Sequence, residues 1–268
     1  EEHVQADVDV WHDQLAEEGL VAQVLPNPMF ALSREEFATW ADGREQFRME
    51  TFYRDQRRRF EVLMEGDRPV GGTWNLDESN REQPPKQQTT LGVPEPWWPT
   101  EAALDEQVRA DLDAMDLDTV GEDGPRKFAV TTGEARAALA AFVRDRLADF
   151  GPYEDAVMGG DWTMSHSLLS VPFNMGVLHP LEAVHAAEQA HRDGDAPLAS
   201  VEGFVRQVLG WREYVWHLYW HLGEEYLERN ALDAHTPLPD WWTSLDAEAV
   251  TAKCLSDALA GVRDRGWV

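Results

Sequence analysis

The side chains best suited to chemistry lie in two short stretches of the second half of the chain. The first, Ser165-His166-Ser167-Leu168-Leu169-Ser170, places hydroxyl groups where a helix is expected to start. Free N–H groups at such a start favour a phosphate. The second is a predicted helix from Val201 to Tyr226 that carries Arg212 in the middle of its apolar stripe. The stripe comprises Val201, Phe204, Val205, Val208, Val215, Tyr219 and Leu222.

Arg212 connects the two stretches. A guanidinium on a buried helix face needs an anion, because an unpaired buried charge is very costly. One interpretation is a salt bridge to Glu213 or Glu202, and the other is a bound phosphate. Combined with the hydroxyl-rich stretch, the second interpretation predicts a diphosphate site. The sequence contains neither a glycine-rich Rossmann fingerprint nor a P-loop, so these two nucleotide-binding turns are not supported.

A metal site is a weaker candidate on the same helix. His217 and His221 have the i, i+4 spacing of zinc ligands, but the helical projection places them on the opposite, polar side. No third ligand is near them in the sequence. A structural role for both histidines is therefore favoured.

The charge of the chain bears on its partners. The 268 residues carry 50 acidic and 23 basic side chains, for a net charge of −27, which repels nucleic acid unless a focused basic cleft exists. The one dense basic patch, formed by Arg54, Arg57, Arg58 and Arg59, is either a solvated helix face with acidic partners or an anion or DNA contact. Acidity spread along the whole chain is typical of a protein that works in high salt, with an ordinary acidic cytoplasmic protein as the alternative.

Cysteine content and hydropathy indicate the compartment. The single cysteine, Cys254, excludes a disulfide within the chain and favours an intracellular setting. No apolar run approaches the length of a membrane span, and the first residues lack the features of a signal peptide. We expect a soluble, cytoplasmic protein.

Three segments of different character must position the candidate residues. Residues 1–32 combine an amphipathic helix at Asp9–Glu18 with a short strand at Val21–Leu25. One strand cannot form a sheet without a partner strand. Residues 33–125 begin with helices, where Ser33 and Glu36 have capping-box spacing, and continue as a long linker with an embedded helix at Leu104–Met115. Residues 126–268 are nearly all helix, at Ala135–Phe150, Ser165–Gly176, Pro180–His191, Val201–Tyr226 and Ala247–Val262.

Four stretches resemble the photolyase and cryptochrome superfamily. More narrowly, they are similar to the iron–sulfur bacterial cryptochromes and prokaryotic (6-4) photolyases, also called deoxyribodipyrimidine photolyase-related proteins. The stretches are Met49 to Arg58, Pro69 to Asn75 with Asp77, Asn80 and Arg81, His166 to Ser170, and Val201 to Tyr214. They occur in order along nearly the whole chain.

The resemblance implies a mainly α fold and an internal fragment of a longer protein. Residues 1–32 would be the C-terminal remnant of a Rossmann-like α/β antenna domain, and 33–125 the helices and inter-domain linker. Residues 126–268 would be the first part of an all-helical domain that holds a U-shaped FAD.

The resemblance also assigns roles to individual residues. The implied FAD contacts are Tyr153, His166, Ser167, Leu168, Leu169, Ser170, Phe204, Gln207 and Arg212. Trp211 and Tyr214 would lie on the DNA-lesion side, and Trp242 would transfer electrons to the flavin. Cys254 would be the first of four ligands of a [4Fe–4S] cluster, which this chain alone cannot complete. A lumazine-type antenna would bind mostly outside this chain. Gly210 makes the spacing from Gln207 to Trp211 one residue longer than in other branches.

The implied activity is light-driven repair. Reduced FAD would donate an electron to a UV-damaged pyrimidine dimer flipped out of DNA. The implied protein is a (6-4) photolyase-like lyase and a monomer with no membrane partner, and the fragment alone is expected to be inactive. A cryptochrome-type photoreceptor with the same FAD site is the alternative. A helical module that binds an anionic ligand is a third hypothesis that does not depend on the resemblance.

Overall fold

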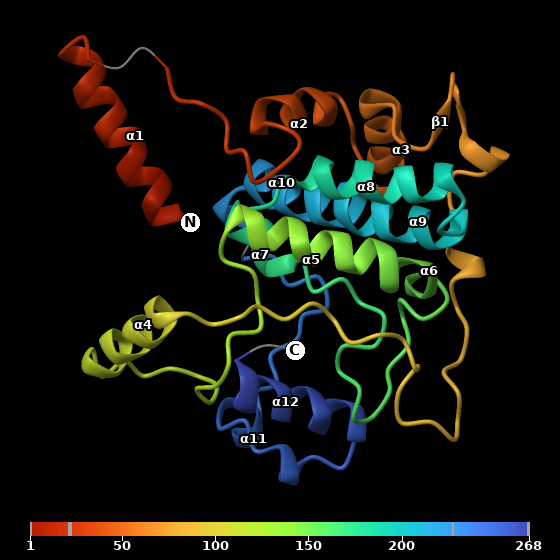
Figure 1. Cartoon of the computed structure of the whole chain (residues 1–268). Helices are drawn as coiled ribbons and strands as arrows, with labels where there is room; N and C mark the ends of the chain where they lie inside the picture. The colour runs from red at the N-terminus through yellow and green to blue at the C-terminus, as the bar shows by residue number, and fades with distance from the viewer. Residues whose placement is uncertain (1, 21–22, 227, 267–268) are drawn as a thin grey trace.

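The computed structural model describes residues 2–20, 23–226 and 228–266, and the described chain is mainly helical (Figure 1). The N-terminal helices are α1 (Glu2–Glu17), α2 (Arg34–Ala41), α3 (Met49–Phe60) and α4 (Ala103–Ala114). They are followed by α5 (Thr132–Asp145), α6 (Leu147–Phe150), α7 (Ser170–Asn174), α8 (Pro180–Asp193), α9 (Leu198–Val205), the π-helix η3 (Arg206–Arg212), α10 (Glu213–Leu222), α11 (Asp240–Thr243) and α12 (Lys253–Arg265). The strands β1 (Met64–Glu65) and β2 (Arg68–Pro69) form an antiparallel hairpin.

The main core lies where α5, α6, α8 and α9 pack together with η3 and α3 (Figure 1). Its centre includes Phe142, Leu147, Val184, Ala187, Val201, Phe204, Val205 and Leu209, all of them buried. A smaller cluster of Leu32, Phe37, Ala41, Phe52 and Tyr214 joins α2 and α3 to α10. The two clusters fix α9, η3 and α10 as the central rod of the molecule.

Local sequence signals explain several helix ends. The Ser33 hydroxyl accepts from the Glu36 N–H at 3.2 Å, and the Ser33 N–H donates to the Glu36 carboxylate at 2.7 Å, which confirms the predicted capping box. Helix α8 has proline at its start and ends at Gly194, whose φ of 83° is left-handed. The helix expected at Leu104–Met115 is α4.

The N-terminal segment differs from the expectation. Of the predicted strand Val21–Leu25, residues 21–22 lie outside the described residues and Gln23–Leu25 are irregular. Within the described ranges, β1 and β2 form the one sheet. Helix α1 lies at the edge of the molecule, where Gln5 accepts from Arg34 at 3.4 Å, and it exposes Val10 and Trp11 (Figure 1). The assignment of three segments as domains or parts of domains stays a prediction.

The helix predicted at Ser165–Gly176 starts only at Ser170. Met164 and Leu168 both have positive φ, 40° and 55°, which an α-helix does not accommodate. The hydroxyl-rich stretch is therefore a loop that leads into one short helix.

The long helix after residue 198 contains a change of register. Because η3 is π-helical, it holds more residues per turn than an α-helix, and the side chains that follow are rotated relative to a regular projection. Glu213 and His217 are consequently buried, whereas Val215 is 56% exposed. The placement of His217 on a polar side is wrong for this reason. The His217 ring instead stacks on Phe37 at 5.2 Å.

In the part of the chain that the structure describes, no helix combines the length and the apolar composition needed to cross a bilayer.

Candidate cofactor-binding site

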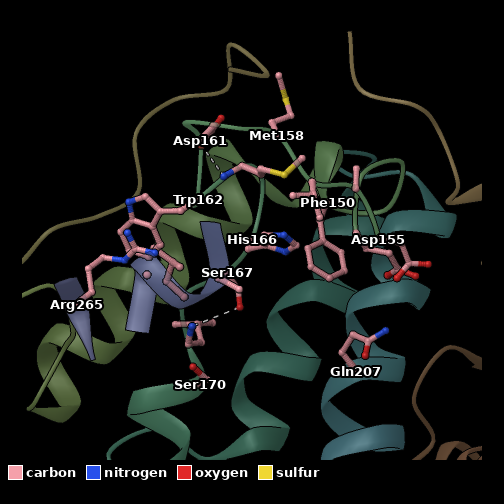
Figure 2. Close-up of a pocket in the computed structure, with 18 of the residues that line it drawn as sticks. Phe150, Asp155, Met158, Asp161, Trp162, His166, Ser167, Ser170, Gln207 and Arg265 are labelled. Carbon is pink, nitrogen blue, oxygen red and sulfur yellow. Dashed lines mark hydrogen bonds between the residues drawn. The ribbon is translucent and has the colours of Figure 1, made fainter. Parts of the chain in front are cut away.

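A cavity of about 1020 Å³ lies between the loop after α6, α7, the α9–η3 rod and α12 (Figure 2). Its size is at the upper end of the range for small-molecule sites. Figure 2 shows His166, Ser167 and Ser170 along one part of its wall and Asp155 and Gln207 along another. The cavity therefore gathers side chains from segments that are distant in the sequence.

The hydroxyl-rich loop contributes a continuous part of this wall. His166, Ser167, Leu168, Leu169 and Ser170 all line the cavity. The Leu169 N–H donates to the Ser167 hydroxyl at 3.4 Å. The left-handed backbone at Leu168 is costly for a leucine, and such strain is concentrated at ligand-binding sites.

Arg212 lies on the wall of the same cavity and is also held by the protein. Its guanidinium donates to the Met29 carbonyl at 2.9 Å and to Asn174 at 3.3 Å, and it lies 3.7 Å from the Glu213 carboxylate. It also lies over the Phe30 ring at 4.1 Å. The salt bridge of Arg212 to Glu213 and its position on the cavity wall thus occur together.

Aromatic rings form the middle of the wall. Phe150 and Phe204 meet edge to face at 5.8 Å between centroids, and the His166 ring meets Phe150 at 6.2 Å. Burial lowers the pKa of His166, and the nearby Arg146 charge lowers it further. The imidazole is therefore neutral at neutral pH and provides a polar but uncharged surface. Gln207 adds an amide to this wall.

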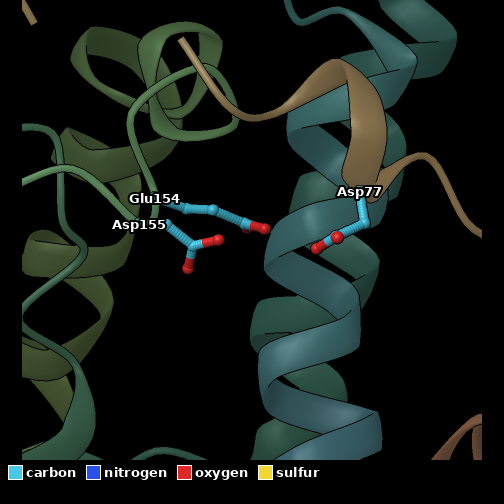
Figure 3. A group of neighbouring side chains, drawn as sticks. All are labelled: Asp77, Glu154 and Asp155. Carbon is cyan, nitrogen blue, oxygen red and sulfur yellow. The ribbon is translucent and has the colours of Figure 1, made fainter. Parts of the chain in front are cut away.

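One end of the cavity is acidic. Glu154 and Asp155 line it, and their carboxylate oxygens come within 4.8 Å of one another and of Asp77 (Figure 3). Arg206 supplies the positive charge there, at 2.9 Å from Glu154 and 3.0 Å from Asp77. Burial raises the pKa of Glu154 to about 7. Glu202, the other partner considered for Arg212, lies 3.5 Å from Arg206.

Several sequence-predicted residues lie off the cavity wall. Tyr153 is half-buried beside it, and Tyr214 packs on Phe52 at 5.7 Å in the smaller core cluster. Trp211 and Trp242 are both 43% exposed. The structure therefore brings together the hydroxyl loop, Phe204, Gln207 and Arg212 but not these four side chains.

Cys254 lines the cavity from α12 as an exposed free thiol. As the one cysteine of the sequence, it would need ligands from outside this chain to hold a cluster.

Sequence reasoning missed Arg146, Glu154 and Arg206. The i, i+4 spacing of Glu202 and Arg206 was a usable signal for the last of these. Arg146 has no such signal, because its hydrogen-bond partners are carbonyl groups of distant residues.

Comparison with known proteins extends the description. The family model for "Deoxyribodipyrimidine photo-lyase-related protein" matches residues 1–128. A (6-4) photolyase of Agrobacterium fabrum is 37% identical over 242 residues, which cover 90% of this chain and 47% of that protein. The chain belongs to the deoxyribodipyrimidine photolyase-related family. It spans about half the length of this curated relative, and the similarity extends past the family-model match into the helical segment that forms the cavity.

Proposed function

We propose that the cavity binds FAD and that the protein is a light-dependent DNA repair lyase of the (6-4) photolyase type. The observation that carries the proposal is that Arg212 and the hydroxyl loop line one cavity. A diphosphate needs a cation and a group of hydrogen-bond donors, and these residues supply both. Family membership and the (6-4) photolyase relative support the same assignment.

The residues present fit an FAD molecule. The cavity is large enough for a dinucleotide, the loop offers the hydroxyls of Ser167 and Ser170, and Arg212 lies on the wall of the same cavity. Phe150 and Phe204 offer the apolar surface that flat rings need, and Gln207 offers an amide that can orient a ring edge. When bound and reduced, FAD supplies the light-driven electron that splits the lesion.

The protein's own groups then hold and shield the cofactor. Ser167, Ser170 and Arg212 bind the diphosphate, and the aromatic wall excludes water from the rings. A neutral His166 accepts or donates one hydrogen bond without adding charge. Following the family resemblance, Tyr153 contacts the flavin, and Trp211 and Tyr214 face UV-damaged DNA.

Three further assignments follow from the resemblance alone. Trp242 relays electrons, Cys254 is one ligand of a [4Fe–4S] cluster, and a lumazine-type antenna binds in the remainder of the full-length protein. We further propose a monomer with no membrane partner.

A photoreceptor without repair activity is the second candidate, and a specific observation favours it. The exposed arginines of α3 are already paired, Arg54 with Glu50 and Arg58 with Asp55, each at 3.0 Å or less. This face is therefore a solvated helix surface rather than an open site for DNA phosphates. A net charge of −27 also opposes DNA binding.

The absorption spectrum and a repair assay of the full-length protein test the proposal. We expect bound flavin and blue-light-dependent repair of an oligonucleotide that contains a (6-4) lesion. A Ser167→Ala, Ser170→Ala double variant is expected to bind FAD at least tenfold more weakly. Ser256→Ala is the matched control, because that hydroxyl donates to the Ala247 carbonyl and lies off the cavity wall.

The outcomes separate the candidates. Failure of the protein to bind flavin contradicts both light-driven functions and leaves a module that binds some other anionic ligand. Bound flavin without repair contradicts the lyase and supports the photoreceptor.

A further inference from the structure

Arg146 is a buried cation at the junction of α5 and α6, with only 2% of its surface exposed. Its guanidinium donates to the carbonyls of Thr163 at 3.0 Å and His166 at 3.3 Å, and also to those of Met164 and Pro94. Three of these four carbonyls belong to the segment that enters the hydroxyl loop. The Arg146 side chain therefore holds this loop by hydrogen bonds to the backbone of the loop.

Arg146 lies behind the loop as seen from the cavity. Ser167 and Leu168 line the large cavity and also a void of about 10 Å³ on their other side. Arg146 lines the void but not the cavity. The loop is thus a wall one chain thick, with the buried cation on one side and the proposed ligand on the other.

Peptide geometry links the two sides of this wall. In a trans peptide, the C=O of one residue and the N–H of the next point in opposite directions. Carbonyls of Met164 and His166 that point at Arg146 therefore turn the N–H groups of Ser165 and Ser167 away from it. Within the described residues neither N–H has an acceptor, and the buried Ser165 hydroxyl also lacks a partner.

Arg146 has no direct ion pair. In the described part of the chain no carboxylate lies within ion-pair distance of its guanidinium, and the carboxylates that act on it from further away are Asp161, Glu95 and Asp145. Its direct partners are carbonyl dipoles, which solvate a cation but carry no net charge. Since arginine stays protonated in proteins, a positive field extends through the loop toward the cavity.

We infer that Arg146 is the positioning residue of the diphosphate site: it fixes the loop with its N–H donors turned away from the guanidinium and places a positive charge without a direct ion pair behind them. This inference rests on the proposed FAD site and adds the N–H of Ser167, which lines the cavity, to the diphosphate contacts proposed for the Ser167 and Ser170 hydroxyls and for Arg212. The chemistry is that of a backbone anion site reinforced by a buried cation.

A matched pair of variants tests the inference. Arg57 is also buried among carbonyls, donating to those of Val62, Leu63 and Trp74, and it lies off the cavity wall. Lysine keeps the charge but cannot replace the planar donor fork. Arg146→Lys and Arg57→Lys should therefore lose similar stability, but only Arg146→Lys should lose affinity for a diphosphate.

The readout is the ratio of FAD affinity to riboflavin affinity, measured by titration of apoprotein, with ADP as a second probe. We expect Arg146→Lys to weaken the binding of FAD and ADP at least tenfold and the binding of riboflavin less than threefold. Arg57→Lys should leave the ratio of the two affinities unchanged. If Arg146 had a merely structural role, Arg146→Lys would weaken the binding of FAD and riboflavin equally, and that result would overturn the inference.

A measurement on the unmodified protein covers the case in which Arg146→Lys does not fold. FAD and ADP should slow amide hydrogen exchange at Ser167, whereas riboflavin should not. Unchanged exchange with FAD bound contradicts the inference and leaves the FAD site intact, whereas failure of the wild-type protein to bind FAD contradicts the proposed function itself.

Discussion

Arg146 and Arg206 are two buried guanidinium groups that each contact a residue of the cavity wall, His166 and Glu154, but they have opposite kinds of partner. Arg146 is surrounded by carbonyls, and Arg206 by the carboxylates of Asp77, Glu154 and Glu202. Burial lowers the pKa of both, but around Arg206 the carboxylates outweigh burial and its pKa is raised. Arg146 therefore has no direct ion pair behind one wall, whereas three carboxylates surround one guanidinium at the other, and this asymmetry favours a single orientation of an anionic ligand.

The largest expected effect is the loss of Arg206. Arg206→Met leaves the buried carboxylates of Glu154 and Glu202 without their cation, whereas the partly exposed Asp77 keeps Arg81 as a partner. The free energy of unfolding should fall by about 3–5 kcal/mol at pH 8. The loss should be smaller at pH 5, because the carboxylates can then take up protons. Urea denaturation at the two pH values measures this.

Arg146→Met is the counterpart in that experiment. Its carbonyl partners do not titrate, so its stability loss should depend on pH less than that of Arg206→Met. It should be only slightly smaller at pH 5, because the variant no longer lowers the pKa of His166. If both variants showed the same pH profile, the contrast between the two charge environments would be wrong.

A medium effect is expected at Glu154. Its folded pKa of about 7 exceeds the unfolded value of 4.5, so the folded state binds more protons between these values and stability falls as pH rises from 4.5 to 7. Glu154→Gln should flatten this slope and raise the melting temperature above pH 7 by on the order of 3 °C. Thermal melts across the pH range measure it.

Glu182→Gln is the control, because Glu182 forms an exposed pair with Arg136. It should leave the pH slope unchanged. If the melting temperature of Glu154→Gln depended on pH as in the wild type, Glu154 would not be the group that takes up the proton in the folded state.

The smallest expected effect is at Leu168. Leu168→Gly removes the cost of a left-handed leucine but adds freedom to the unfolded chain, so the free energy of unfolding should change by less than about 1 kcal/mol. FAD affinity should stay within threefold, because Arg146 fixes the loop. A tenfold loss of FAD affinity would instead show that Leu168, and not Arg146, determines the conformation of the loop.

The sequence was informative where signals are local. The capping box at Ser33 and the starts of α4 and α8 follow from nearby residues, and the predicted pairing of Arg212 with the hydroxyl loop matches their position on one cavity. Apolar periodicity identified the central rod as helical, because a long amphipathic pattern averages over local irregularities.

The remainder depends on contacts that no local pattern encodes. Arg146 reaches carbonyls 17 to 52 residues away, and Glu154 meets Arg206 across 52 residues. The burial of His217 depends on η3, and a fixed angle per residue cannot represent one widened turn. These features required three-dimensional packing to be seen.

The widened turn at Arg206–Arg212 also limits how this protein can be recombined with its relatives. Grafting a helix that lacks the additional residue would rotate everything downstream by roughly 100° relative to its present setting. The Glu213 carboxylate would then lose the hydrogen bonds that it accepts from the N–H groups of Ala31 and Leu32. Chimeras should therefore exchange the whole rod, together with the irregular segment around Ala31 and Leu32 that contacts it, as one block.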